Sequence, residues 1–256
     1  MAKWMSVVFS LMMLLGQGCG ENANNPQNGT LRAFLTDAVG GYEAVHITFT
    51  EISAHLDTQW VILSKQMQTV NLLEWNNGKT LLLGQAEVEA GKYTQIRLKI
   101  ASAEIVLNGK TYPLTVPSGV QSGLKLLANF EVAAGSTYDI VLDFDVERSI
   151  VATGPRGNPG SFKLKPTIRV AAMALTGSIS GNVTNPADLP VAYALAGSDT
   201  ITSTSVNGTT GFFRLAFLPP GIYSISVSDT SRKSFQKSGV AVTAGNDNSL
   251  GQVTLQ

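Results

Sequence analysis

The stretch Tyr138-Asp-Ile-Val-Leu-Asp-Phe-Asp-Val146 alternates apolar and acidic residues more sharply than any other part of the chain. Its even positions from 140 onward are apolar: Ile140, Leu142, Phe144 and Val146. Its odd positions are mostly acidic: Asp139, Asp143, Asp145 and, just beyond, Glu147, with Val141 between them. A period of two places these sets on opposite faces of an extended strand. The stretch therefore predicts a β-strand with one face in a core.

Runs of the same kind occur on both sides of this strand, at 30–36, 44–52, 60–63, 68–72, 93–107 and 162–172. Gly, Pro and Asn residues separate them, which is typical of antiparallel sandwiches. Asn108-Gly109 predicts a two-residue hairpin turn after the longest run. Only residues 81–90 suggest a helix, and Gly84 interrupts that pattern. We therefore expect an all-β protein.

A second alternating series begins near Leu175 and continues to the last residue. Its length of about 80 residues suits a small autonomous sandwich. The sequence thus predicts two antiparallel β-sandwich domains of the immunoglobulin or transthyretin kind, over 29–173 and 174–256.

The composition excludes several classes of function. Lys and Arg together number 18, as do Asp and Glu, and only 14% of the 256 residues are charged. Such a balance gives no overall field for nucleic acid, which we do not expect as a partner. One Cys and two His are too few for a structural zinc site or an internal disulfide. No cofactor is expected, apart from a possible Ca²⁺ ion.

The first residues are typical of an export signal. Lys3 precedes an apolar run at 7–15, which is too short to span a bilayer but fits the core of a signal peptide over 1–18. Cys19 follows at the position that bacterial lipoproteins use for lipid attachment. The polar residues up to Asn28 predict a flexible tether.

The resemblance to Gram-negative lipoproteins, with Gly20 after the cysteine, implies an outer-membrane location and a membrane partner. Leu15 lies one position further from Cys19 than the lipoprotein pattern requires. Gly16 and Gly18 also suit the ordinary signal peptidase. A secreted or periplasmic protein with an unmodified Cys19 is therefore the alternative.

Two family resemblances follow from ordered motifs. The first sandwich resembles the bacterial envelope family DUF4382, a domain of unknown function, through motifs spread over Gly29 to Val170. They include Leu35-Thr-Asp-Ala38, Gly91-x-Tyr93-x-x-Ile96-Arg-Leu98, Gly123-Leu-Lys125 and Leu142-Asp-Phe-Asp145. The second resembles a carboxypeptidase-regulatory-like domain of the transthyretin type. Its motifs are Gly177-x-Ile179-x-Gly181-x-Val183, Thr210-Gly-x-Phe213 and Leu218-Pro-Pro-Gly-x-Tyr223. The second resemblance implies a fold rather than an activity.

The acidic face of 138–146 allows two interpretations. Asp143 and Asp145, with Asp37 near the end of an early strand, could supply oxygen ligands to a calcium ion. The alternative is a charge ladder in which Arg97 and Lys99, on the polar face of another long strand, neutralise Asp143 and Asp145.

Carbohydrate binding requires exposed aromatic rings that stack on the apolar face of a sugar. Trp75, just before the Asn76-Asn77-Gly78 turn, is the leading candidate, followed by Tyr42 and Tyr193. Packing is the alternative for Trp75 because Leu72 and Leu73 precede it, and Trp60 is expected in the core.

Nothing in the sequence resembles a nucleophilic catalytic group. Ser118 lies in no Gly-x-Ser-x-Gly elbow, and His46 and His55 are both in one segment. We therefore expect no catalytic residues and no enzyme. The sequence predicts a non-catalytic envelope lipoprotein that binds a glycan or a surface protein. The alternatives are a structural scaffold or spacer and, less favoured, a hydrolase acting on envelope material.

Overall fold

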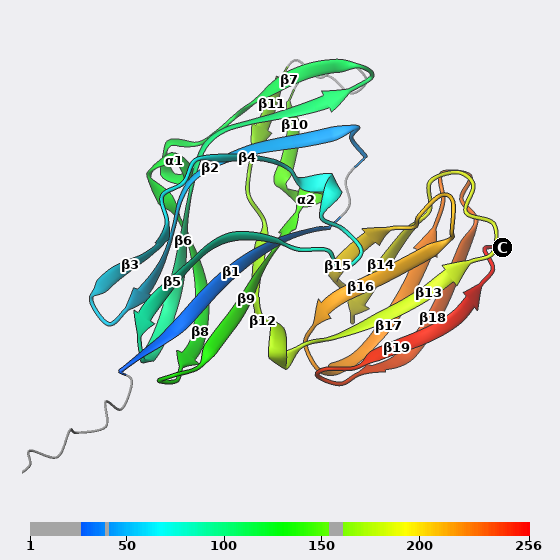
Figure 1. The fold of residues 1–256 in the computed structure, drawn as a ribbon. Coiled ribbons are helices and arrows are strands. Elements are labelled where there is room, and N and C mark those ends of the chain that lie inside the picture. The colour runs from blue at the N-terminus through cyan, green and yellow to red at the C-terminus, as the bar shows by residue number, and fades with distance from the viewer. Residues whose placement is uncertain (1–26, 39–40, 154–160) are drawn as a thin grey trace, which may run out of the picture.

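The computed structural model describes residues 27–38, 41–153 and 161–256. The expected signal peptide, Cys19 and most of the tether lie outside these ranges. The described chain folds as two β-sandwiches that stand side by side (Figure 1). Its described helices include none that is long and apolar enough to cross a bilayer.

The N-terminal sandwich consists of two sheets. Sheet A has four strands, in the order β12 (Ile168–Ala172), β9 (Thr137–Asp145), β1 (Asn28–Ala38) and β5 (Leu81–Glu89). Sheet B has eight strands, of which six follow the order β10 (Ile150–Thr153), β11 (Ser161–Leu164), β7 (Lys110–Thr115), β6 (Gly91–Leu107), β2 (Ala44–Leu56) and β3 (Gln59–Ser64). The other two are β4 (Gln68–Asn71), which pairs with β2, and β8 (Leu124–Val132), which pairs with β6.

The C-terminal sandwich is smaller. Sheet C has the order β16 (Phe212–Leu218), β13 (Gly177–Val183) and β19 (Asp247–Val253). Sheet D has the order β15 (Asp199–Ser205), β14 (Val191–Ala196), β17 (Gly221–Ser228) and β18 (Ser234–Val242). Helical segments are short: η1 (Leu72–Glu74), α1 (Ser118–Gly123), α2 (Val146–Ser149) and η2 (Met173–Leu175), the last of which precedes β13.

The expected all-β fold is confirmed, with mostly antiparallel pairing. Parallel pairs occur as well: β1 with β9, β7 with β11 and β13 with β19. The expected hairpin also forms, because Asn108 and Gly109 adopt φ values of 52° and 68° between β6 and β7. Two positive φ angles give a turn whose twist matches that of the flanking strands.

Each sandwich encloses its own core. The apolar face of 138–146 is fully buried as predicted, with Leu142 and Phe144 at 0% exposure. On the facing sheet B, the side chains of Ile47, Ile96 and Leu98 belong to the same buried hydrophobic cluster. The C-terminal core gathers around Phe213, Leu215 and Val227, among others.

Residues 81–90 form no helix, and that expectation was wrong. The segment forms β5, and Gly84 lets sheet A approach sheet B closely. A Cβ atom at Gly84 would lie 2.8 Å from both Ile52 Cγ2 and Ser64 Cβ. The glycine that interrupts the helical pattern is therefore a contact point between sheets.

The expected charge ladder between 93–107 and 138–146 was also wrong, because β6 and β9 belong to different sheets. Arg97 and Lys99 instead bind Glu51 on β2, at 3.2 and 3.1 Å. Trp60 likewise lies outside the core. It is half-buried on the outer face of sheet B, with the Arg97 guanidinium carbon 4.2 Å from its ring centroid.

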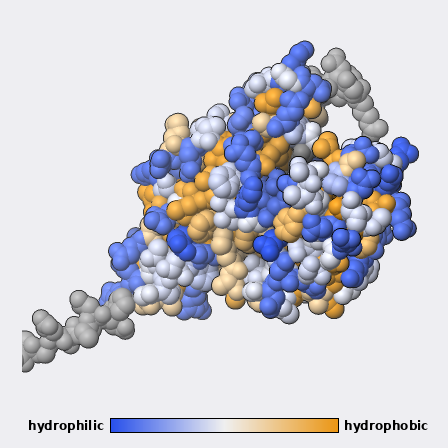
Figure 2. Space-filling view, turned by 45° about the vertical axis from the view of Figure 1, so that its right-hand side comes forward, coloured by the Kyte–Doolittle hydropathy of each residue, from blue (hydrophilic) through white to orange (hydrophobic). Residues whose placement is uncertain are grey.

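From Val141 onward the second face of β9 is buried as well, because the C-terminal sandwich covers this part of the outer face of sheet A. Strand β15 packs against β1 and β9. The molecule thus has sheet B on one side, sheet A in the middle and the C-terminal sandwich on the other side. In the space-filling view, polar and apolar residues are interspersed over the face shown (Figure 2).

Candidate functional site

The seam between the sandwiches is polar. Thr36, Asp37 and Asp143 of sheet A are each 4% exposed. The facing strand β15 contributes Thr202, Ser203 and Thr204, which are exposed by 5% or less. Hydroxyl groups can satisfy buried carboxylates and backbone groups, so polar strands can cover one another.

Three arginines bind the acidic face of β9, and Arg32 on β1 holds Asp139 through two hydrogen bonds of 2.6 Å. Arg169 on β12 donates through Nη2 to Asp143 Oδ2 at 2.6 Å, and through Nη1 to the Phe217 carbonyl at 2.6 Å. It therefore links both sandwiches. Asp145 accepts from the backbone N–H of Arg148 at 2.9 Å, at the start of α2, and pairs with the side chain of the same residue.

The structure does not support the calcium interpretation of Asp37, Asp143 and Asp145. In the part of the chain that it describes, no three His, Cys, Asp or Glu side chains gather as a metal-binding group. Guanidinium groups bind two of the three carboxylates, which leaves them poorly placed for a cation. The expected neutralisation by basic residues holds, but with Arg169 and Arg148 as the partners.

The Asn76-Asn77-Gly78 turn inserts into the C-terminal sandwich. Asn77 has a φ of 56°, and its Oδ1 accepts from Thr204 Oγ1 at 3.1 Å and from the Arg214 backbone N–H at 2.9 Å. Its Nδ2 donates to the Ser205 carbonyl at 3.0 Å. The sequence places this turn next to Trp75, the leading candidate for sugar stacking. In the structure the turn instead joins the two sandwiches.

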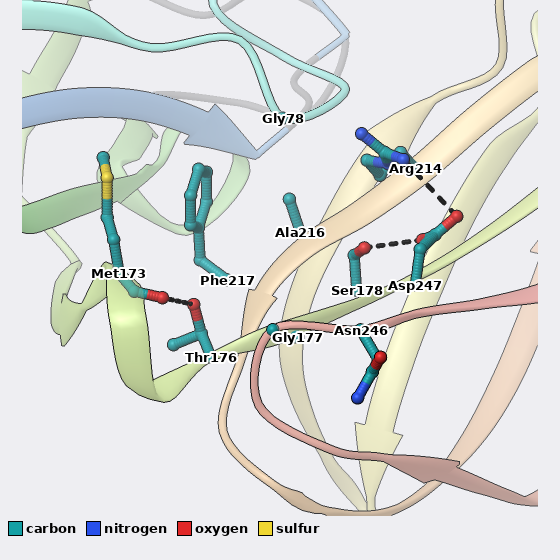
Figure 3. Close-up of a pocket in the computed structure, with 11 residues that line it drawn as sticks. Gly78, Met173, Thr176, Gly177, Ser178, Arg214, Ala216, Phe217, Asn246 and Asp247 are labelled. Atoms are coloured by element: carbon teal, nitrogen blue, oxygen red, sulfur yellow. Dashed lines mark hydrogen bonds and ion pairs between the residues drawn. The ribbon is translucent and has the colours of Figure 1, made fainter.

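A cleft of about 320 Å³ opens beside this turn (Figure 3). Gly78 belongs to the N-terminal sandwich, whereas the other lining residues come from η2 and the C-terminal sandwich. In Figure 3, Met173 and Phe217 stand on one side of the cleft and Arg214, Ser178 and Asp247 on the other, with Ala216 between them.

The charged side of the cleft is organised around Asp247. Ser180 Oγ donates to Asp247 Oδ2 at 2.6 Å, and Arg214 Nη2 lies 3.4 Å from the same oxygen. Burial by itself would raise the pKa of Asp247, but hydrogen bonds from Ser178 and Ser180 and the charge of Arg214 outweigh it. The net effect lowers the pKa, so Asp247 is ionised at neutral pH.

The apolar side of the cleft contains a backbone outlier. Phe217 has a φ of 56°, which is unusual for a bulky residue. Its carbonyl accepts the hydrogen bond from Arg169, and this bond helps to hold the conformation. The ring is half-buried and lines the cleft. Strained residues that surrounding contacts hold in place are concentrated at functional sites.

Trp75, Tyr42 and Tyr193 are all only partly exposed. Trp75 packs against the N-terminal core, and its carbonyl accepts from Thr36 Oγ1 at 2.8 Å and from the Asp37 N–H at 3.0 Å. This geometry favours the packing alternative for Trp75.

The two tyrosines come from different sandwiches but lie near one carboxylate. Burial and the charge of Glu147 raise the pKa of both Tyr42 and Tyr193, with Asp145 adding to the effect on Tyr193. Neither tyrosine is among the residues that line the cleft. Tyr42 packs against the N-terminal core.

The cleft could not be found from the sequence. Arg214 and Phe217 lie on β16, Asp247 begins β19, and Gly78 belongs to the other sandwich. No local spacing joins these residues. The nearest signal is the proline-glycine turn after Leu218, which marks a strand end but no site.

These features define a two-domain, all-β protein with a polar seam and a charged cleft beside it. Residues 28–166 match the profile of DUF4382, described as a domain of unknown function, and the chain belongs to this family. Residues 178–256 match the carboxypeptidase regulatory-like domain. Both expected resemblances are confirmed. A search of curated proteins gives no match.

Several solved structures are distantly similar to the chain. The Bacillus anthracis TIE protein shares 9% identity over 90% of this chain and 51% of its own, with a TM-score of 0.25. The major pilin subunit BcpA of Bacillus cereus shares 10% over 90% and 70%, with a TM-score of 0.20. The fimbrial anchor protein Mfa2 of Porphyromonas gingivalis shares 12% over 82% of each chain, with a TM-score of 0.19. The chain spans about half the length of the TIE protein.

Proposed function

We propose that this protein is a non-catalytic carbohydrate-binding module of the bacterial cell envelope, and that the cleft beside Asn77 is its binding site. The observation that carries the proposal is the composition of the cleft. It combines an ionised carboxylate, a guanidinium group and an aromatic ring in about 320 Å³. Sugars require this combination of polar and apolar contacts.

Each side of the cleft has a role in this proposal. Asp247 accepts hydrogen bonds from sugar hydroxyls, and Arg214 donates to them. The ring of Phe217 stacks on the apolar face of the pyranose, with Met173 beside it. The contact between the two sandwiches fixes these groups in advance, which reduces the entropic cost of binding.

The proposed location is the outer membrane, through a lipid on Cys19. A radiolabelled fatty acid should be incorporated into the full chain and not into a Cys19→Ser variant. Equal labelling of both would place the acyl chain elsewhere, and labelling of neither would favour the secreted or periplasmic alternative.

The binding site can be tested with polysaccharides. Immobilised mannan, dextran, chitin and peptidoglycan are incubated with the full chain and with two variants, Phe217→Leu and Phe235→Leu. Phe235 is the matched control because it is another half-buried phenylalanine of the C-terminal sandwich, on β18. Phe217→Leu should weaken binding roughly tenfold, the worth of a good aromatic contact. Phe235→Leu should bind like the wild type.

Two further variants test whether sugar binds in the cleft or at Trp75, the aromatic residue that the sequence favours. Asp247→Asn should weaken binding, whereas Trp75→Phe should leave it unchanged. Loss of binding in Trp75→Phe with none in Phe217→Leu would contradict the cleft proposal and restore Trp75 as the platform. Binding of none of the polysaccharides would favour the surface-protein alternative.

A structural spacer is the second candidate function, and the docking of Asn77 favours it. A rigid two-domain unit could hold a partner at a fixed distance from the membrane. A spacer would tolerate Phe217→Leu in every binding assay, and would lose its role in cells when residues 174–256 are deleted.

A further inference from the structure

The outer face of sheet B presents two neighbouring rows of side chains across four strands. The strand registers place Ile62, Ser53, Arg97 and Lys125 in one row and Trp60, His55, Gln95 and Leu127 in the next. Strands about 4.8 Å apart give each row a width of about 14 Å. We call these two rows, together with Glu51, Lys65 and Lys99 beside them, the basic face.

The basic face has an excess of positive charge. Arg97 and Lys99 bind Glu51, whose side chain is only 11% exposed, and Lys65 lies near enough for its charge to act on Glu51. Lys125 lies 5.9 Å from the Trp60 ring centroid. The basic face therefore carries four basic side chains and one acidic side chain, Glu51. The whole chain, by contrast, has a formal net charge of zero.

The same face exposes large apolar side chains at both ends of its rows. Leu127 on β8 is 84% exposed and Ile62 on β3 is 41% exposed. Both point away from the core, because the neighbouring Leu126 and Leu63 are buried. Exposed aliphatic groups beside lysines and a tryptophan are typical of surfaces that enter the headgroup region of a bilayer.

Gly123, at the end of α1, lies against the Arg97 side chain, since a Cβ atom there would be 2.6 Å from Arg97 Cδ. The C-terminal sandwich leaves the basic face uncovered. The C-terminal sandwich packs on sheet A, on the opposite side of the N-terminal sandwich (Figure 1). A partner on the basic face would therefore leave both the cleft and the C-terminal sandwich free.

We propose that the basic face lies on an anionic lipid surface. The lysines and Arg97 would face acidic headgroups, while Leu127, Ile62 and the edge of Trp60 reach the boundary of the acyl chains. An acidic polysaccharide would satisfy the charges but not the exposed leucine and isoleucine, so the lipid surface is the better fit. In this orientation the C-terminal sandwich lies on the far side from the bilayer.

Vesicle sedimentation tests the proposal with the exported, unacylated Cys19→Ser protein. Vesicles of phosphatidylcholine alone are compared with vesicles that contain phosphatidylglycerol as well. The double variant Lys65→Gln/Lys125→Gln should bind the anionic vesicles about 30-fold more weakly, which corresponds to about 1 kcal/mol for each lysine. Leu127→Gln should also weaken binding.

Matched controls come from the C-terminal sandwich. Lys233→Gln/Lys237→Gln removes two exposed lysines, and Leu189→Gln replaces a leucine that is 79% exposed. Both should sediment with anionic vesicles as the wild type does. The cleft variant Phe217→Leu should do so too, so a failure of the carbohydrate proposal leaves this test intact.

Three results would overturn the proposal. They are equal binding to neutral and anionic vesicles, unchanged binding by the lysine double variant, and equal losses in the control variants. Salt-sensitive retention on polygalacturonate, with no sedimentation with vesicles, would assign the face to an acidic polysaccharide instead.

Discussion

Asn77 joins the two sandwiches at the scale of a single residue. It adopts a positive φ, which asparagine tolerates better than most residues, and its side-chain amide then satisfies buried groups on β15 and β16. The Asn77 side-chain amide thus makes three hydrogen bonds to the C-terminal sandwich, and all three depend on a turn of the N-terminal sandwich. A residue with no side-chain amide would leave the Ser205 carbonyl and the Arg214 N–H without these partners.

Replacing Asn77 by glycine removes the amide without straining the turn, because glycine adopts positive φ readily. We expect the free energy of unfolding to fall by about 2 kcal/mol, the cost of leaving buried polar groups unpaired. Urea unfolding measures the change. Asn108→Gly is the matched control, since Asn108 has a φ of 52° in an exposed turn, and it should change stability by only a few tenths of a kcal/mol.

Asp247 gives a second prediction at this scale. Its folded-state pKa lies below the reference value of 3.8, so its contribution to stability is fully present above that value. The contribution disappears as the pH falls through the lower, folded-state pKa. Asp247→Asn should therefore destabilise the protein more at about pH 7 than at about pH 2.5. A difference in unfolding free energy that is the same at both pH values would contradict the lowered pKa.

At the scale of elements, Gly84 allows β5 to approach β2 and β3. Gly84→Ala should destabilise the fold by about 2 kcal/mol, because the added methyl group overpacks the space between the sheets. Thermal and urea unfolding measure this. Gly119→Ala is the control, since nothing lies within 4 Å of its Cβ position and α1 gains a better helix former. A neutral Gly84→Ala would mean that the sheets can separate at this point at little cost.

The strands themselves could be predicted from the sequence, because period-two alternation and Asn-Gly turns are local signals. The partners of each strand could not. The acidic side chains of β9 have the pattern of a solvent-exposed face. From the sequence alone, Arg97 and Lys99 of β6 are therefore the expected partners of these carboxylates. In the fold a polar strand of the other sandwich covers this face, and such an interface has no hydrophobic pattern to read.

The candidate site was less predictable than the fold for the same reason. Trp75 does lie beside the Asn76-Asn77-Gly78 turn, as the sequence predicts. That turn binds the C-terminal sandwich, however, and does not expose the Trp75 ring to a ligand. Phe217 and Asp247 acquire their role only when β16, β19 and the Asn77 turn come together. Residues that gain function from long-range contacts leave no signal in their own segments.

At the scale of the whole molecule, the buried polar seam should make the two sandwiches unfold together. The tryptophans within the described ranges, Trp60 and Trp75, both lie in the N-terminal sandwich. Their fluorescence reports that sandwich, whereas far-ultraviolet circular dichroism reports both. The two unfolding curves of the wild type should coincide, and Asn77→Gly should separate them. Separate transitions in the wild type would show that the seam is too weak to couple the domains.

Hydrogen–deuterium exchange with a bound polysaccharide tests the central claim, that the cleft between the sandwiches binds carbohydrate. The wild-type chain is saturated with the polysaccharide that it binds best among mannan, dextran, chitin and peptidoglycan, and exchange is compared with that of the free protein. We predict slower exchange in peptides covering 173–178, 214–217 and 245–247, with no change across β3 and β8. Protection confined to β3 and β8, or unchanged exchange around the cleft at saturation, would contradict the claim.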